Sequence, residues 1–153
     1  MPLEKRFRAW LYAAFAVLFV SGALWLAADA LAEGPGLGDW AGAGALLLMI
    51  HGGAAMALLL LLGALFPLHV LPGWRLDRNR GSGLAMVVVD AVLILTAFGL
   101  YYLGSEQLRA WTSDLHIALG LALPAVLLLH VVLGKREAAR RRRAAMDAVM
   151  ADE

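Results

Sequence analysis

Residues 41–68, AGAGALLLMIHGGAAMALLLLLGALFPL, decide the fold because none of their side chains carries a permanent charge. A helix rises about 1.5 Å per residue, so about 20 apolar residues cross a hydrocarbon core of about 30 Å. Backbone amides inside lipid must form hydrogen bonds within their own segment, which a helix achieves. The stretch therefore predicts a membrane-spanning helix, with His51 inside it and His69 just beyond it.

Three more stretches nearly free of charge lie at residues 9–28, 84–103 and 115–133, and 62% of the 153 residues are hydrophobic. This composition predicts an all-α protein, a four-helix transmembrane bundle with no room for a separate soluble domain. The predicted helices are residues 9–31, 40–71, 83–104 and 111–134. They form one domain, 1–134, which a basic tail, 135–153, follows.

Pro67 lies near the end of the second predicted helix, where its ring would clash with the carbonyl of Gly63. Transmembrane helices tolerate proline because their surroundings compensate the lost hydrogen bond, so we expect a kink and not a stop. The helix is then expected to continue to Leu71 and to end before Pro72.

The basic residues indicate the orientation. Of the 13 lysines and arginines, all except Arg109 lie at the N-terminus, between the second and third helices, or in the tail. The positive-inside rule places these three segments, and therefore both termini, in the cytoplasm. We expect an integral protein of a bacterial-type inner membrane, in contact with the lipid bilayer. The basic tail is expected to bind anionic headgroups or, alternatively, a partner protein, whereas binding to nucleic acid is not expected.

The four histidines occupy only the second and fourth predicted helices. His69 stands at i+18 relative to His51, which is five helical turns, and His130 stands at i+14 relative to His116, just under four turns. Each pair therefore projects from nearly one face of its helix. Ionisable residues at membrane depth are costly and usually functional, so this pattern indicates a site.

Two parallel helices would bring His51 level with His116 near the outer face, and His69 level with His130 near the inner face. Such opposed imidazoles can ligate the iron of haem b from both sides of its ring. The two spacings differ by about 6 Å along the helix axes, so the inner site depends on the helix beyond Pro67. If that mismatch persists, His69 is an interfacial residue and only the outer haem forms.

The positions of the glycines and the absence of cysteine further restrict which cofactor the chain can bind. Glycine follows His69, His116 and His130 at the fourth position, and follows His51 directly, which would leave space for a flat macrocycle; small residues also serve bare helix packing. A chain with no cysteine cannot attach c-type haem or ligate an iron–sulfur cluster.

The segment Leu115-His116-Ile117-Ala118-Leu119-Gly120, continuing through Pro124 to Leu129-His130-Val131-Val132-Leu133-Gly134, resembles the fourth helix of small membrane cytochromes b. That family includes the bacterial cytochrome b561 group, the cytochrome subunits of formate dehydrogenase and hydrogenase, and the flavinylation-associated cytochromes. Its members typically take a further haem ligand from the first helix. Residues 10–28 contain no histidine, so the resemblance implies that His69 substitutes for that ligand.

Charged residues are further candidates for the site. Arg109 on the outer side and Arg80 or Arg75 on the inner side can pair with haem propionates, because guanidinium matches carboxylate geometry. Asp90, inside the third helix, is expected to accept a hydrogen bond from an inner histidine, to receive protons during quinone reduction, or to reach toward Arg80.

These features predict transmembrane electron transfer through one or two b-type haems. The chain would exchange electrons with a quinone or a partner redox protein, as a quinone-linked oxidoreductase or as its electron-transfer subunit. Two alternatives stay open: a histidine-lined path for divalent metal ions, since imidazole binds zinc, copper and nickel, and an assembly subunit without a cofactor. Superoxide is a disfavoured substrate because the predicted outer face is acidic.

Overall fold

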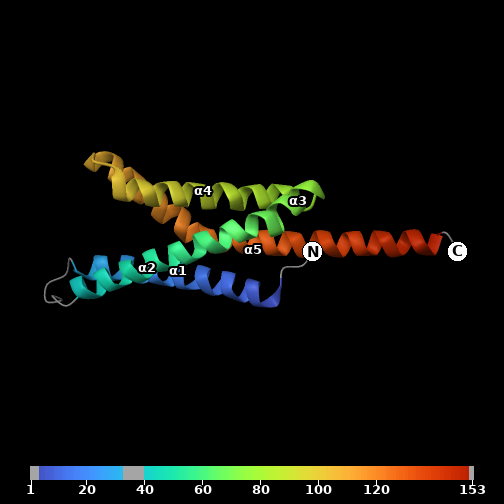
Figure 1. Ribbon diagram of the computed structural model, residues 1–153, viewed down its shortest axis with the longest axis horizontal. Coiled ribbons are helices and arrows are strands. Elements are labelled where there is room, and N and C mark those ends of the chain that lie inside the picture. Colours follow the sequence, from blue (N-terminus) through green and yellow to red (C-terminus); the bar gives the residue numbers. More distant parts are fainter. Residues whose placement is uncertain (1–3, 33–39, 152–153) are drawn as a thin grey trace. The chain divides into compact units, whose positions relative to one another are not determined.

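The computed structural model describes residues 4–32 and 40–151, in which every regular element is helical (Figure 1). The elements are α1 (Lys5–Ala32), α2 (Trp40–Leu65), the π-helical turn η1 (Phe66–Val70), α3 (Leu71–Arg75), α4 (Arg80–Tyr102) and α5 (Glu106–Ala151). Because α2, η1 and α3 follow one another without a break, the described chain has four helices long and apolar enough to cross a membrane. The prediction of an all-α protein with four such helices is confirmed.

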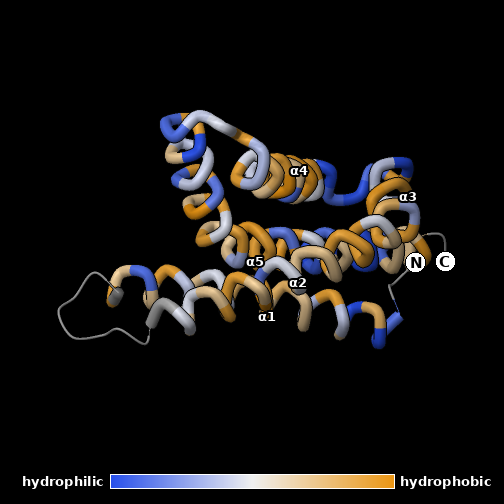
Figure 2. Tube along the Cα trace, turned by 60° about the vertical axis from the view of Figure 1, so that its left-hand side comes forward, coloured by the Kyte–Doolittle hydropathy of each residue, from blue (hydrophilic) through white to orange (hydrophobic). Residues whose placement is uncertain are grey.

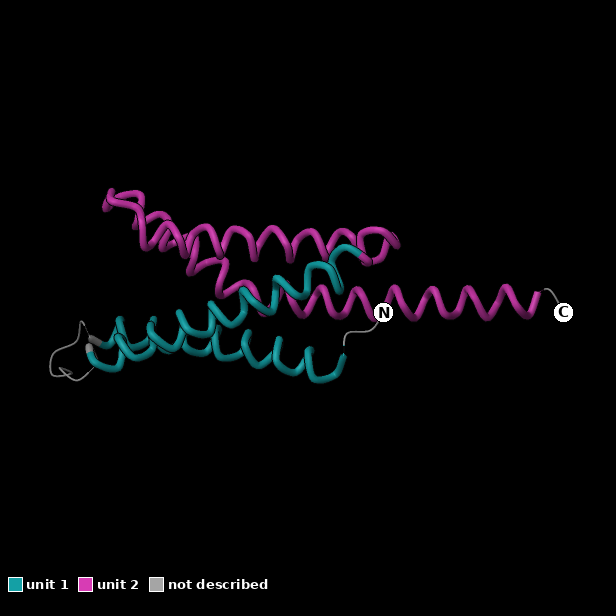
Figure 3. The backbone as a smooth tube through the Cα atoms, in the orientation of Figure 1, with its two compact units in different colours: residues 1–71 teal, residues 72–153 magenta. Residues whose placement is uncertain are grey.

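The helices form two antiparallel hairpins that belong to separate compact units (Figure 3). In residues 1–71, α1 packs along α2, and Leu11, Phe15, Ala28 and Leu58 are the buried apolar side chains. In residues 72–153, α4 packs along α5 over the buried Leu123. Each hairpin therefore encloses only a thin seam of buried side chains.

Large apolar side chains cover the outer surfaces of both hairpins. Leu60 is 80% exposed, Met49 74% and Leu95 69%. Figure 2 shows α1, α2 and α4 as largely hydrophobic. A soluble protein rarely leaves such continuous apolar surface in water. Lipid would satisfy these side chains, so the four long apolar helices indicate an integral membrane protein.

The helix through Pro67 is bent into a π-turn and continues farther than the sequence predicted. The N–H of Leu71 donates to the carbonyl oxygen of Phe66, the i→i−5 bond of a π-helix. This wider turn accommodates Pro67, which has no N–H to donate. The predicted end before Pro72 is wrong, because Pro72 lies in the first turn of α3, directly after the π-turn, and the helix ends at Arg75.

The last helix is also longer than predicted. We expected residues 111–134, whereas α5 begins at Glu106 and continues to Ala151, with Pro124 inside it. Residues 135–151 are almost entirely alanine, arginine, lysine, glutamate and methionine, all strong helix formers, so Gly134 does not end the helix. The basic tail therefore begins as a direct extension of a membrane-spanning helix.

Candidate functional site

His51 is held against α1 by two hydrogen bonds. Its Nδ1 lies 2.9 Å from the carbonyl oxygen of Leu18 and 3.2 Å from the hydroxyl oxygen of Ser21. The ring rests directly on Gly22, where a Cβ atom would lie only 2.9 Å from the Cε1 atom of His51. Gly22 and the buried Ser21 of α1 therefore both contact the ring of His51.

His116 has the corresponding arrangement in the other hairpin. Its Nδ1 lies 2.8 Å from the hydroxyl oxygen of Thr96 on α4. The Thr96 hydroxyl also lies 2.8 Å from the carbonyl oxygen of Val92 and 3.0 Å from that of Leu93. Thr96 and Ser21 are the buried polar side chains of the described residues, and each contacts a histidine.

His130 lies near the beginning of α4, against Ser82 and Asn79. Its Nδ1 is 3.0 Å from the Ser82 hydroxyl oxygen, which in turn lies 2.6 Å from the side-chain oxygen of Asn79. The Asn79 side-chain nitrogen donates to the carbonyl oxygen of His130 at 3.1 Å and lies farther, 3.4 Å, from its Nδ1. Polar groups of α4 and of the residue before it therefore surround this ring edge.

These contacts assign the tautomer of His51 and permit the same tautomer in His116 and His130. The Leu18 carbonyl can only accept, so Nδ1 of His51 must carry the hydrogen. Thr96 and Ser82 each have a single hydroxyl hydrogen; where it is donated to the Val92 carbonyl oxygen or to Asn79, the hydroxyl oxygen can accept from Nδ1 of His116 or His130. A neutral ring protonated at Nδ1 has its lone pair on Nε2, the usual form of a metal-ligating histidine.

The two contacts between α4 and α5 share one helical register. Thr96 stands at i+14 relative to Ser82, as His130 does relative to His116, and the helices run in opposite directions. Equal intervals on antiparallel helices bring both pairs into contact together, so both histidine rings face α4. Sequence reasoning missed the hydroxyl residues, although the repeated interval was a signal for them.

His69 lies in the π-turn and not in a regular helix. A π-turn takes about one residue more than an α-turn, so it rotates His69 by up to about 100° from the face predicted for an unbroken helix. The His69 side chain is exposed on its hairpin, whereas His51 is half-buried. The spacing of 18 residues therefore does not place His51 and His69 on one face, because the π-turn interrupts the α-helical repeat between them.

The glycines near the histidines differ in their surroundings. A Cβ on Gly134 would lie 3.3 Å from the Asn79 side-chain nitrogen, and one on Gly73 would lie 3.8 Å from the Arg78 carbonyl oxygen. These two glycines permit a close approach of the segment between α3 and α4. A Cβ on Gly120 or Gly53 would meet no atom within 4 Å, so neither glycine is required by a close contact with a described residue.

The predicted charged residues have different positions. Arg80 donates to the carbonyl oxygen of Trp74 at 2.9 and 2.6 Å and forms an ion pair with Asp77 at 3.0 Å, so it holds the turn between α3 and α4. Arg109 is exposed in the first turns of α5, and Asp90 is half-buried within α4. Neither Arg109 nor Asp90 forms an ion pair with another described residue.

Within residues 4–32 and 40–151, three or more histidine, aspartate or glutamate side chains do not converge as a group that could hold a metal ion. A bis-histidine haem requires only two protein ligands. The pairing of His51 with His116, and of His69 with His130, joins residues of different units and stays a prediction. Comparisons with models of protein families, with curated proteins and with solved structures find no match for this chain.

Proposed function

We propose that this chain is a small membrane cytochrome b, which ligates haem b through its histidines and transfers electrons across the bilayer. One observation carries the proposal: Nδ1 of His51, of His116 and of His130 lies within hydrogen-bond distance of an oxygen on the neighbouring helix, at 2.9, 2.8 and 3.0 Å. Such a bond orients the ring, fixes the tautomer and increases the basicity of Nε2.

The outer ligands fit the proposal best. His51 stands at i+11 relative to Trp40, where α2 begins, and His116 stands at i+10 relative to Glu106, where α5 begins. At about 1.5 Å per residue, both lie about 15 to 17 Å along their helices. His51 and His116 would therefore be the two histidines that hold the outer haem.

The inner ligands are proposed as His69 and His130. His130 has its orienting contacts in Ser82 and Asn79. The π-turn supports this assignment because such turns are frequent at functional sites, where they change the direction of a side chain. His69 would supply the ligand that the first helix lacks.

Haem b bound by these histidines would supply one-electron chemistry between ferric and ferrous iron. The protein's contribution is to hold the ring nitrogens, exclude water through the surrounding apolar side chains, and adjust the reduction potential through the hydrogen bonds at Nδ1. Arg109 is the candidate partner of an outer propionate. Electrons would be exchanged with a quinone or a partner protein, because the described helices contain no domain for a nucleotide cofactor.

The optical spectrum of the purified protein tests this proposal. We expect a Soret band that sharpens when dithionite is added, an α-band typical of b haem, and one or two haems per chain by the pyridine haemochrome assay. A folded, colourless protein that acquires no haem on reconstitution would contradict the proposal. Binding of zinc or nickel by that protein would instead favour a metal path, and no binding would favour an assembly subunit.

Replacing Thr96 by valine is expected to raise the midpoint potential of the haem ligated by His116 while the haem stays bound. Valine keeps the shape of threonine but removes the hydroxyl 2.8 Å from Nδ1, so a ring that donates to this hydroxyl would become less basic and would stabilise ferric iron less. The expected change is about tenfold in the reduction equilibrium, or about 59 mV for one electron. A redox titration measures it, and Thr96→Ser, which keeps the hydroxyl, should behave as the wild type. Equal potentials in the two variants would show that this hydrogen bond does not influence the iron.

A further inference from the structure

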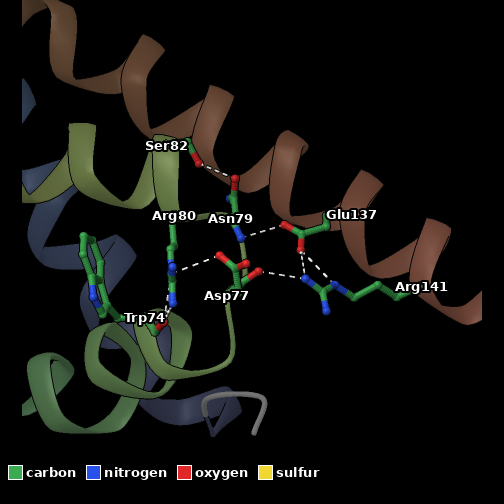
Figure 4. Close-up of polar contacts among 7 residues, drawn as sticks. All are labelled: Trp74, Asp77, Asn79, Arg80, Ser82, Glu137 and Arg141. Carbon is green, nitrogen blue, oxygen red and sulfur yellow. Dashed lines mark hydrogen bonds and ion pairs between the residues drawn. The ribbon is translucent and has the colours of Figure 1, made fainter.

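The segment between α3 and α4 is held to α5 by polar contacts on the side where α4 begins (Figure 4). The N–H of Asn79 donates to Glu137 at 2.6 Å, and Arg141 donates to the carbonyl oxygen of Asp77 at 2.7 Å. Glu137 and Arg141 also form an ion pair at 2.7 Å. We call these contacts the loop clamp. All of its residues belong to one compact unit.

Asn79 has a backbone conformation that few residues adopt. Its φ of 48° and ψ of 39° place it in the left-handed region, which glycine and asparagine tolerate best. This conformation lies directly before α4 and turns both the N–H and the side chain of Asn79 toward α5. The carboxylate of Glu137 holds the N–H, and the side chain reaches Ser82 and His130.

Asn79 also decides in which direction the Ser82 hydroxyl donates. Its side-chain oxygen takes the single hydrogen of that hydroxyl at 2.6 Å. The Ser82 oxygen can then only accept from Nδ1 of His130, 3.0 Å away, whereas the side-chain nitrogen of Asn79, which can only donate, lies farther from that Nδ1, at 3.4 Å. Without Asn79, Ser82 could turn its hydrogen toward His130 and favour the opposite tautomer, in which Nε2 carries the hydrogen.

We infer that Asn79 is a positioning residue for His130: it fixes the ring tautomer through Ser82, and the loop clamp holds Asn79 in place. As a deduction about haem ligation, this inference rests on the proposed function, because a ring protonated at Nδ1 presents Nε2 to iron. As a deduction about the tautomer, it stands without haem. Asn79, just before the first residue of α4, would thereby set which ring nitrogen of His130 carries the hydrogen.

Two glycine variants test the inference, since glycine keeps the left-handed backbone. Asn79→Gly removes the amide that contacts Ser82 and His130. Asp77→Gly is the matched control, because Asp77 has a φ of 52° in the same segment and its carboxylate contacts Arg80 and not the histidine. Both variants keep the backbone groups that bind Glu137 and Arg141. The first readout is the pair of ¹⁵N shifts of the His130 ring in haem-free protein.

We expect wild type and Asp77→Gly to show the tautomer protonated at Nδ1, and Asn79→Gly to shift the tautomer ratio toward Nε2 by about tenfold, the strength of one ordinary hydrogen bond. In haem-loaded protein, Asn79→Gly should change the reduction equilibrium of one haem by about tenfold and leave that of the other haem unchanged. Identical shifts in all three proteins would overturn the inference, as would equal effects of the two variants. A protein that binds no haem would contradict the proposed function and leave the ¹⁵N comparison decisive for Asn79.

Discussion

Replacing His116 by alanine is expected to remove one haem per chain and to leave any second haem spectrally unchanged. His116 is one of the two histidines proposed to hold the outer haem, and its loss would leave that haem with a single protein ligand. The buried Thr96 hydroxyl, which contacts His116, can still donate to a carbonyl oxygen of its own helix α4 when the imidazole is removed. The measurement is haem content per chain by pyridine haemochrome, with helical content by circular dichroism.

The control for this experiment is Leu115→Ala, which truncates the preceding residue of α5. The Leu115 side chain is 47% exposed and makes no polar contact in the described structure, so haem content should not change. Full haem content in the His116→Ala protein would exclude His116 as a ligand. Loss of haem in both variants would point to damage to the helix in place of loss of a ligand.

Replacing Gly22 by alanine is expected to release the same haem without altering any histidine. The new Cβ would lie 2.9 Å from Cε1 and 3.1 Å from Nδ1 of His51, so the ring must move away from α1. That movement breaks its 2.9 Å hydrogen bond to the Leu18 carbonyl oxygen and displaces Nε2. Alanine is the better helix former by about 1 kcal/mol, so a general loss of stability is not expected.

Haem content and thermal unfolding of the Gly22→Ala protein separate these effects. We expect haem content to fall to the level of the His116→Ala protein, while helical content stays that of the wild type. Gly42→Ala on α2 is the matched control, because a Cβ at Gly42 meets no atom within 4 Å. Unchanged haem in the Gly22→Ala protein would show that the position of the His51 ring is not critical for ligation.

The sequence predicts the helices well because charge is so costly in lipid. Uncharged stretches such as 41–68 leave helix as the stable conformation, and four such helices are present. Their ends are less predictable, since proline is tolerated in a first turn, as Pro72 shows, and a helix former such as Ala138 continues a helix whether or not lipid surrounds it. The π-turn at Pro67 was not predictable, because proline also permits a simple kink.

The histidines stand out in the sequence, but the residues that orient them do not. Serine and threonine occur in membrane helices for many reasons, including contacts within their own helix such as that of Thr96 with Val92. Their contact with a histidine depends on how two helices align, which no single segment encodes. Asn79 was still less visible, since its role depends on a left-handed backbone and a contact with Glu137, far along the chain on α5.

The equal intervals on α4 and α5 restrict which changes of length this protein can accept. One residue inserted between Ser82 and Thr96 would rotate the hydroxyls relative to each other by about 100° and separate one of them from its histidine. The same insertion made also between His116 and His130 would keep both contacts. Substitutions can therefore accumulate in these two segments singly, whereas insertions and deletions must occur in both together.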